Sequence, residues 1–287
     1  MAQDYQVAAL WIGGNLSFLE QLCLKSFVDA GQHIRLYHYH PIDNVPEGVE
    51  MADANEVLPE PGNGFIRHGR TQSPALHSDL FRYHMLMLDD RTIWADTDAY
   101  CCKPFTTPSG HFHAWESAEG INGGVLGLPR DSATLAALLD FTADEYAIPP
   151  WFSDKEKARL EAAKAEGNPV PAGEMPWGVW GPHALTHFLK ATGESRFTMP
   201  RVALYPVEYK DRRLMLRPNY DLSDQITDET FSIHFYGRRM RARILEAFDG
   251  IPRPQSLIGK LLKKHGIDPL AAPIPVKPGV VDQDGDD

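Results

Sequence analysis

Two aspartates with one residue between them, Asp96-Thr97-Asp98, follow a short apolar stretch at residues 92–95. On an extended backbone, side chains two positions apart point to the same side, so both carboxylates can face one point. Two carboxylates this close repel each other unless a cation lies between them. Carboxylate oxygens beyond a strand end suit Mg²⁺ or Mn²⁺. The pair therefore predicts a divalent-metal site that presents a metal-bound phosphate ligand, although Asp-x-Asp also occurs in ordinary surface turns.

The composition limits what such a site can bind. The 287 residues allow one large α/β domain or two small ones, with a sizeable core. The formal net charge of −11 argues against a nucleic-acid-binding surface. An acidic protein of this kind takes up an anionic diphosphate only with the help of a metal or of local arginines. Both features should be present if the aspartate pair serves a diphosphate.

The cysteines and the apolar runs indicate a cytoplasmic protein. Cys23, Cys101 and Cys102 are odd in number and two are adjacent, which predicts reduced thiols rather than a disulfide framework. The first residues lack the basic start and apolar run of a signal peptide, and no apolar run is long enough to span a bilayer. Peripheral contact with the inner face of a membrane remains an alternative.

Elements that could position the aspartates precede them in the chain. Residues 7–12 are a continuous apolar run that predicts a buried parallel strand, residues 16–30 have helical spacing, and residues 33–40 alternate as a second strand. This is a βαβ unit, which is normally right-handed. Residues 49–58 predict a third, shorter strand. No Gly-x-Gly-x-x-Gly follows the first strand, which argues against a dinucleotide cofactor.

A helix is predicted directly before the apolar stretch, with Ser73 as its cap, Pro74 in its first turn and its end near Leu88. Asp79 and Arg82 are three residues apart and are therefore neighbours on one flank of this helix. An intrahelical ion pair on the surface, which is worth little energy, is the simpler interpretation of these two residues on their own.

The second half of the chain predicts strands at residues 112–115, 121–127, 202–207 and 231–236, and helices at residues 132–146, 153–166, after Gly181-Pro182, and at 255–265. The highly charged helix belongs to an insertion at about residues 147–182. His111 and His113 are most simply explained as exposed loop or strand residues. Residues 251–287 are predicted to be a C-terminal extension with a partly disordered acidic tail, and its helix could dock on the domain or touch an anionic membrane surface.

The order Ser78-Asp79-x-x-Arg82-Tyr83, apolar strand, Asp96-x-Asp98 resembles the DXD-motif sugar transferase family. These glycosyltransferases have a GT-A fold. They include capsule, lipopolysaccharide and glycolipid hexosyltransferases and are related to the catalytic domains of the clostridial glucosylating toxins. The match covers about residues 5–130. Where the family has Gly-Gly-x-Tyr, this chain has Asp89-Asp90-Arg91-Thr92. The resemblance implies an α/β fold, a single GT-A-type domain at residues 1–250 with a Rossmann-like mixed sheet flanked by helices.

The resemblance also implies roles for individual residues. Asp98 would bind the metal directly, and Asp96 would bind the ribose, or the metal through water. Asp79 and Arg82 would contact the ribose and phosphate side of a nucleotide. Trp11, together with Ile12, would lie near the base, although core packing explains Trp11 equally well.

Residues of the second half complete this predicted site. Asn122 and Gly123, in a glycine-rich strand, are assigned to the donor-sugar pocket, with a β-bulge as the alternative. Arg238 and Arg239 open a cluster of four arginines that would offset the charge of a diphosphate. By the resemblance His234 is a third metal ligand, and a satisfied core histidine is the alternative.

The implied activity is metal-dependent transfer of a hexose from a nucleotide-diphosphate sugar, UDP-hexose by preference, to a glycan or glycolipid acceptor with retention of configuration. The metal would be Mn²⁺ or Mg²⁺. Glu116, Glu208 and Asp221 are possible catalytic carboxylates, and their spacing selects none of them. A non-catalytic protein that binds a nucleotide sugar or a glycan is the alternative from another class, and an adaptor acting through the proline-rich C-terminal segment is a third.

Overall fold

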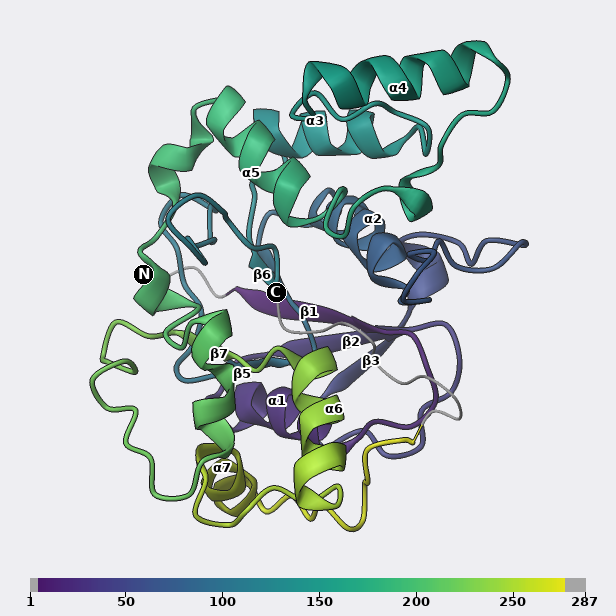
Figure 1. Cartoon of the computed structure of the whole chain (residues 1–287). Helices are drawn as coiled ribbons and strands as arrows, with labels where there is room; N and C mark the ends of the chain where they lie inside the picture. Colours follow the sequence, from purple (N-terminus) through teal and green to yellow (C-terminus); the bar gives the residue numbers. More distant parts are fainter. Residues whose placement is uncertain (1–4, 277–287) are drawn as a thin grey trace.

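A computed structural model of the chain describes residues 5–276 and shows a central sheet with helices on both faces (Figure 1). The strands are β1 (Gln6–Trp11), β2 (Ile34–His38), β3 (Glu50–Asp53), β4 (Thr92–Ala95), β5 (Ala99–Cys101), β6 (Val125–Leu126) and β7 (Ser232–His234). The helices are α1 (Phe18–Asp29), α2 (Ala75–Leu86), α3 (Ala133–Thr142), α4 (Asp154–Ala165), α5 (Pro182–Ala191), α6 (Gly237–Phe248) and α7 (Leu257–His265). The predicted α/β class, a mixed sheet flanked by helices, is confirmed.

The main sheet has the strand order β3-β2-β1-β4-β6, and a separate two-stranded sheet pairs β5 with β7. The first four strands run parallel, and β6 is antiparallel to β4 with Trp94 opposite Leu126. Val7 in β1 lies opposite both Ile34 and Ile93, so β1 is the centre of the sheet. Burial on both faces explains why this strand is apolar from Val7 to Trp11.

Each face of the sheet is covered by helices that are far apart in the sequence. In Figure 1, α2, α3, α4 and α5 lie on one side of the sheet and α1, α6 and α7 on the other. On the first side Phe81 of α2, Leu138 of α3 and Leu185 of α5 share one buried cluster. On the second side Leu22 of α1, Ile244 of α6 and others share another. The first cluster packs helices against the main sheet, and the second joins α1, α6 and α7 to the small sheet of β5 and β7.

Two predicted strands are wrong. Residues 202–207 do not pair in a sheet; the segment starts in a 3₁₀ turn, Arg201–Ala203, and continues as irregular chain. Its side chains, such as Leu204 and Tyr205, are apolar because they are buried, not because they face a neighbouring strand. Residues 112–115 make only isolated bridges, for example from Phe112 to Gly127. Short buried runs of this kind have the same composition as strands.

The predicted start of α2 and the predicted exposure of two histidines also need correction. Pro74, not Ser73, is the N-terminal flanking residue of α2, and no side chain caps the helix there. His113 is fully buried and the His111 side chain is only 8% exposed, because His111 stacks on Phe197 with ring centroids 4.1 Å apart. The loop that carries both histidines is folded into the domain.

The helix of the C-terminal extension docks on the domain. Ile258 and Leu262 of α7 are buried against the side of the sheet that carries α1. The His265 ring joins Asp29 of α1 (2.6 Å) to the hydroxyl of Tyr100 (2.9 Å). Among residues 5–276, no helix has the length and apolarity to cross a membrane. The predicted acidic tail lies outside the described residues.

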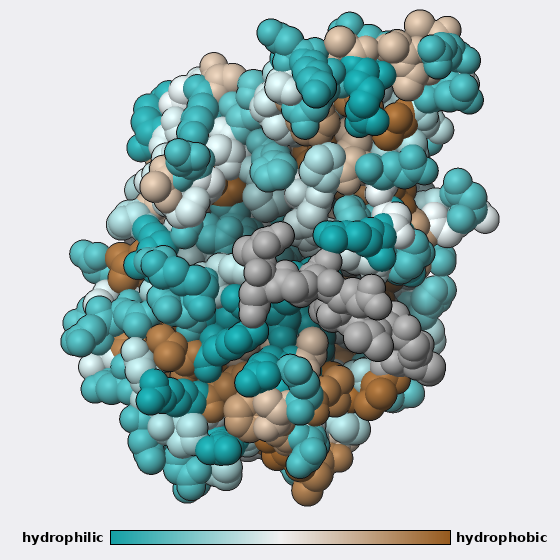
Figure 2. All heavy atoms as spheres, in the orientation of Figure 1, coloured by the Kyte–Doolittle hydropathy of each residue, from teal (hydrophilic) through white to brown (hydrophobic). Residues whose placement is uncertain are grey.

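Helix α4 belongs to the segment predicted to be an insertion. Only Leu160 of this helix is buried, and Ser153 with Glu156 forms a capping box at its start. Figure 2 shows mostly hydrophilic side chains in the region of α4 at the top of the molecule. With one buried residue, this helix gains little from core packing, and its capping box satisfies the first free backbone amides.

Candidate active site

The turn between β4 and β5 carries the aspartate pair. Asp96 and Asp98 lie between the two strands, and the amide of Ala99 donates to the carbonyl of Asp96 (2.9 Å). The amide of Asp96 donates to the carbonyl of Gly124 (2.7 Å), just before β6. The turn is therefore fixed from both sides, and both carboxylates are held where the central sheet ends.

His234 reaches the same point from the other end of the chain. It is the last residue of β7 and lies opposite Ala99 of β5. The amide of Phe235 donates to the carbonyl of Asp98 (2.9 Å), which fixes the two segments together. One ligand atom from each of Asp96, Asp98 and His234 lies within 4.8 Å of the others. The three residues predicted to bind metal are brought together.

The charges of this group compensate one another. His234 Nε2 lies 3.2 Å from Asp98 Oδ1, and the amide of Gly237 donates to Asp98 Oδ2 (2.6 Å). Burial alone would raise the pKa of Asp98, but His234, the Gly237 amide and Arg241 hold that pKa well below its ordinary value. Burial lowers the pKa of His234, yet the Asp98 charge outweighs burial and raises this pKa to about 9. An ion pair of carboxylate and imidazolium results.

The donor set fits a divalent metal. Asp98 Oδ1 is buried and has no well-aligned hydrogen bond from any described residue, because its ion pair with His234 is poorly oriented. A buried carboxylate oxygen needs a positive charge beside it, which the His234 imidazolium supplies here and which a bound cation would supply in its place. Two carboxylates and one imidazole are ligands that Mn²⁺ accepts readily, and Mg²⁺ accepts the carboxylates. Asp96, Asp98 and His234 would hold such an ion.

A second group of charges supports Asp96. Arg82 Nη2 lies 2.9 Å from Asp79 Oδ1 and 3.4 Å from Asp96 Oδ1, and its Nη1 donates to the carbonyl of Gly123. The indole of Trp94 also donates to Asp96 Oδ1 (2.7 Å). Asp79 and Arg82 are 8% and 7% exposed, so the surface ion pair that was the simpler interpretation is wrong. The pair is buried and orients one of the predicted metal ligands.

Burial shifts the pKa values of this second group. Desolvation raises the pKa of Asp79 to about 7, although Arg82 opposes the shift and Asp96 adds to it. Desolvation also raises the pKa of Asp96, again against Arg82, and the nearby Asp98 charge raises it further. Clusters of shifted carboxyl groups in a cleft are typical of functional sites.

Two glycines allow the close approach of these charged groups. A Cβ at Gly123 would lie 2.5 Å from Arg82 Nη1, and a Cβ at Gly124 would lie 3.2 Å from His234 Nε2. The segment before β6 thus passes directly over the charged centre. This explains the glycines, and the β-bulge is not needed as their explanation.

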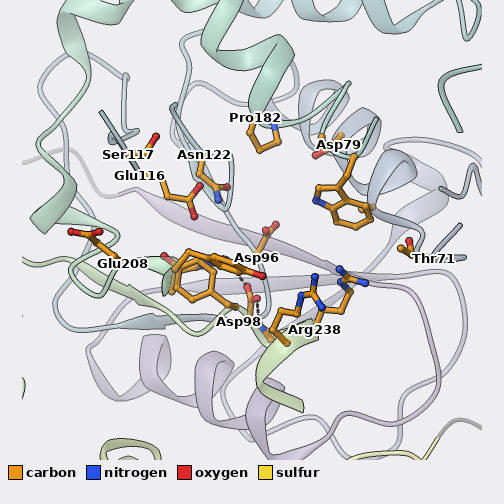
Figure 3. A pocket seen from close by; sticks show the side chains of 18 of the residues that line it. Thr71, Asp79, Asp96, Asp98, Glu116, Ser117, Asn122, Pro182, Glu208 and Arg238 are labelled. Carbon is orange, nitrogen blue, oxygen red and sulfur yellow. Dashed lines mark hydrogen bonds and ion pairs between the residues drawn. The ribbon is translucent and has the colours of Figure 1, made fainter. Parts of the chain in front are cut away.

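A cavity of about 1370 Å³ opens over the charged centre. In Figure 3, Asp96 and Asp98 lie between Glu116 and Asn122 on one side and Arg238 on the other. Of the predicted site residues, the following line the cavity: Asp79, Arg82, Asp96, Asp98, Asn122, His234, Arg238 and Arg239. This volume would accommodate a nucleotide and a sugar unit.

The arginines enter the cavity from the start of α6. Tyr236 precedes this helix in a left-handed conformation (φ 54°), which turns the chain from β7 directly into α6. Arg238 and Arg239 follow in the first turn and line the cavity, where the helix dipole also favours anions. The Arg238 guanidinium lies 5.2 Å from the ring of Trp177, which is 42% exposed. This wall of the cavity is basic and aromatic.

Three predicted site residues lie elsewhere. Among the described residues, the cavity lining does not include Trp11, Ile12 or Gly123. The Trp11 indole donates to the carbonyl of Gly14 (2.8 Å), and Ile12 packs against the core on the α2 side. Gly123 contacts Arg82 through its carbonyl oxygen. The structure therefore gives Gly123 a supporting position behind the charged centre.

Several residues of the site were not predicted. Trp94 donates to Asp96, and the Tyr205 hydroxyl donates to the carbonyl of Asn122 (3.1 Å). The rings of Tyr205 and Tyr236 lie 5.6 Å and 4.5 Å from the His234 ring. Trp94 and Tyr236 adjoin predicted ligands in the sequence and could have been inferred from that. Tyr205 had no such signal.

Comparisons with known proteins give little further information. No protein-family model matches the chain, and no curated protein matches it. Thirty-four chains of solved structures match, and one of them is titled "PaToxG Glycosyltransferase". That chain is 13% identical, the alignment covers 68% of this chain and 70% of that one, and the TM-score is 0.43. At this level the likeness carries no argument about activity or ligands.

Proposed function

We propose that this chain is a metal-dependent glycosyltransferase that moves a hexose from a nucleotide-diphosphate sugar, UDP-hexose by preference, to a glycan or glycolipid acceptor. The observation that carries the proposal is the convergence of Asp96, Asp98 and His234 at the floor of a large cavity, beside Arg238 and Arg239. A carboxylate-rich metal site next to cations is suited to a diphosphate, since neither component alone would hold one in an acidic protein.

Two sets of cavity residues would stabilise the leaving diphosphate. When bound by Asp96, Asp98 and His234, Mn²⁺ or Mg²⁺ supplies a positive charge that stabilises the leaving diphosphate. Arg238 and Arg239 stabilise the same developing negative charge from the start of α6. No strong nucleophile is required for a reaction of this kind, and retention of configuration through front-side displacement is part of the proposal.

Other residues bind and orient the donor. Arg82 and Asp79 face the ribose and phosphates, and the Asn122 amide hydrogen-bonds hydroxyl groups of the sugar. The roles of Trp11 and Ile12 near the base, and of Gly123 in the sugar pocket, stay predictions. Trp177, exposed at the cavity wall, is placed to stack on a sugar face. We assign it to the acceptor side, with the segment at about residues 147–182.

A glycolipid acceptor would require the enzyme to work at the surface of a membrane. Lys260, Lys263 and Lys264 are exposed on α7, while its apolar residues face the domain. These lysines would let the protein approach an anionic cytoplasmic membrane surface without insertion.

The test is binding of UDP and of GDP by calorimetry, with and without Mn²⁺, to the wild type and to Asp98→Asn. The proposal expects UDP to bind only with Mn²⁺ and expects the variant to lose at least about tenfold in affinity, because a ligand charge is lost. Asp221→Asn is the matched control, since Asp221 is exposed and, among the described residues, its carboxylate bonds to Ser223 of the same loop. Metal-dependent binding of GDP alone would replace the donor class.

Hydrolysis of UDP-hexoses separates an enzyme from a binding protein. A transferase slowly passes the sugar to water, whereas a protein that only holds the donor releases it intact. Metal-dependent UDP binding without hydrolysis of any UDP-hexose would favour the non-catalytic alternative. If neither nucleotide binds with Mn²⁺, the metal site and the proposed activity both fail.

A further inference from the structure

One carboxylate of the cavity differs from all the others. Five carboxylates line it: Asp79, Asp96, Asp98, Glu116 and Glu208. Four of them are paired, the first two with Arg82, the third with His234, and Glu208 with Lys210 (3.0 Å) and Arg201 (3.7 Å). Within residues 5–276, the Glu116 carboxylate makes neither a hydrogen bond nor an ion pair.

The backbone around Glu116 is rigid. The amide of Glu116 donates to the carbonyl of Gly120 (2.9 Å), and Trp115 before it bridges to Ile121. The amide of Trp115 donates to the carbonyl of Met199 (3.1 Å), and the amide of Ile121 to the Thr186 hydroxyl (2.9 Å). A tight turn anchored at both ends thus presents a partly buried carboxylate that has no partner among residues 5–276. Such preorganisation is what a catalytic group needs.

The Glu116 charge faces the metal ligands. Glu116 lines the same cavity as all three predicted metal ligands and as Tyr236, whose ring lies 4.5 Å from the His234 ring. Figure 3 shows Glu116 beside Asn122, with Asp96 and Asp98 between it and Arg238. The cavity therefore has a carboxylate on one side of the charged centre and cations on the other.

The carboxylate on one side of the cavity and the cations on the other match the charges that develop in glycosyl transfer. The leaving diphosphate gains negative charge, which belongs on the side of Arg238 and Arg239. The sugar ring gains positive charge at its anomeric carbon, which a carboxylate stabilises. The sugar would lie between the two sides. Glu208 is already neutralised by two cations, and Asp221 is exposed and outside the cavity lining.

We propose that Glu116 is the catalytic carboxylate of the reaction and contacts the transferred sugar. This assignment rests on the proposed function. The bond from the anomeric carbon to the diphosphate oxygen breaks, and its electron pair leaves with that oxygen. The acceptor hydroxyl oxygen bonds to the same carbon from the same face. Its proton passes to the departing diphosphate oxygen. The Glu116 carboxylate offsets the positive charge of the ring and forms no bond to the sugar.

The experiment compares the wild type with Glu116→Gln and Glu119→Gln in the hydrolysis of UDP-hexoses, where water replaces an unknown acceptor. Glu119 is an exposed residue of the same turn and is the matched control. We expect Glu116→Gln to lower kcat at least about 100-fold, while the calorimetric Kd for UDP with Mn²⁺ stays within about threefold. Glu119→Gln should keep kcat within about twofold of the wild type.

A second variant guards against a purely structural effect. Glu116→Ala should regain part of its kcat when formate is added, because formate restores the missing charge, and a misfolded protein would show no such rescue. A folded Glu116→Gln variant with kcat within threefold of the wild type would overturn the role. So would an equal loss of UDP affinity and kcat. A wild type without metal-dependent UDP binding or hydrolysis would instead overturn the proposed function, before any Glu116 variant is measured.

Discussion

Arg82 contacts Asp79, Asp96 and the carbonyl oxygen of Gly123 at once, and its guanidinium lies 5.1 Å from the Trp94 ring. Desolvation opposes its charge, but the two carboxylates more than compensate, so the pKa of Arg82 is raised. A buried guanidinium with three partners fixes the position of each of them. At the scale of single residues, this one side chain holds Asp96 of the candidate metal site in place.

Gly123→Ala tests this role of Arg82. The added Cβ would meet Arg82 Nη1 at 2.5 Å, so the guanidinium must shift and its ion pairs must weaken. We expect the free energy of unfolding to fall by about 1–3 kcal/mol, measured by urea denaturation. Gly14→Ala is the control, since nothing lies within 4 Å of a Cβ there. Equal stability of the two variants would show that Arg82 moves freely and does not organise the site.

Individual residues of the site were predictable to different degrees. The spacing of Asp96 and Asp98 suggested that they share a side of an extended chain, but it fitted a surface turn equally well, and the resemblance decided between the two. In the structure the pair lies in a turn, where the Ala99 amide donates to the carbonyl of Asp96 (2.9 Å). His234 came only from the resemblance, since no local pattern reveals that β7 pairs with β5. The base-side prediction for Trp11 relied on the end of a strand, and the structure instead satisfies its indole within the following turn. Interactions between residues that are a few positions apart can be inferred from a sequence. Interactions between residues that are distant in the sequence and meet only on folding cannot.

Helix α6 shows the same limit at the scale of elements. The sequence presents Arg238, Arg239, Arg241 and Arg243 as one basic cluster. Helical geometry separates them: the first two line the cavity, Arg241 reaches Glu20 in α1, and Arg243 pairs with exposed Glu246 (2.9 Å). Only half of the cluster can therefore act on a ligand.

Arg241→Gln should destabilise the protein. Glu20 is 1% exposed, and its carboxylate also accepts from Ser17 in the capping box of α1. Removing the guanidinium leaves this buried charge uncompensated, which costs about 3 kcal/mol. Arg243→Gln on the same helix removes only a surface pair and should cost at most about 0.5 kcal/mol. Chemical denaturation of both variants gives the comparison, and a similar loss in the two would disprove the role of Arg241.

Long periodic elements were predicted well and short ones poorly. The continuous apolar run of β1 and the helical spacing of α1 each matched the structure within two residues. The turn before β4 formed without the glycines of the family, because the Asp89 side chain accepts from the Arg91 amide (2.9 Å). Residues 202–207 failed because tertiary packing buried an irregular segment that has the composition of a strand.

At the scale of the whole molecule, His113 should make the free energy of unfolding depend on pH in the acid range. Both ring nitrogens are buried without a hydrogen-bond partner among the described residues. Burial, assisted by His111 and opposed by Glu194, lowers the pKa of His113 to about 3 from 6.5. Between these values the unfolded chain binds a proton that the folded chain does not. Stability should therefore fall as the pH decreases from 6.5 towards 3, by about 2–3 kcal/mol at pH 4.5 from this residue.

His113→Phe is the variant that tests this effect. It keeps a ring in the buried position and removes the titration, so its free energy of unfolding should depend less on pH below 6.5 than that of the wild type. His40→Gln serves as the control, because the His40 side chain is 56% exposed. Parallel pH profiles for the wild type and His113→Phe, measured by urea denaturation, would contradict the shifted pKa.

The pairing of β5 with β7 affects the order in which the protein folds during its synthesis. A ribosome delivers the sheet from β1 to β6 and most of the helices before it reaches His234. Domains begin to fold while they are being made. The nascent chain can therefore bury its first core while the candidate metal site still lacks the His234 imidazole and the arginines of α6. Truncation by premature termination before His234 would thus leave a packed core without the proposed activity.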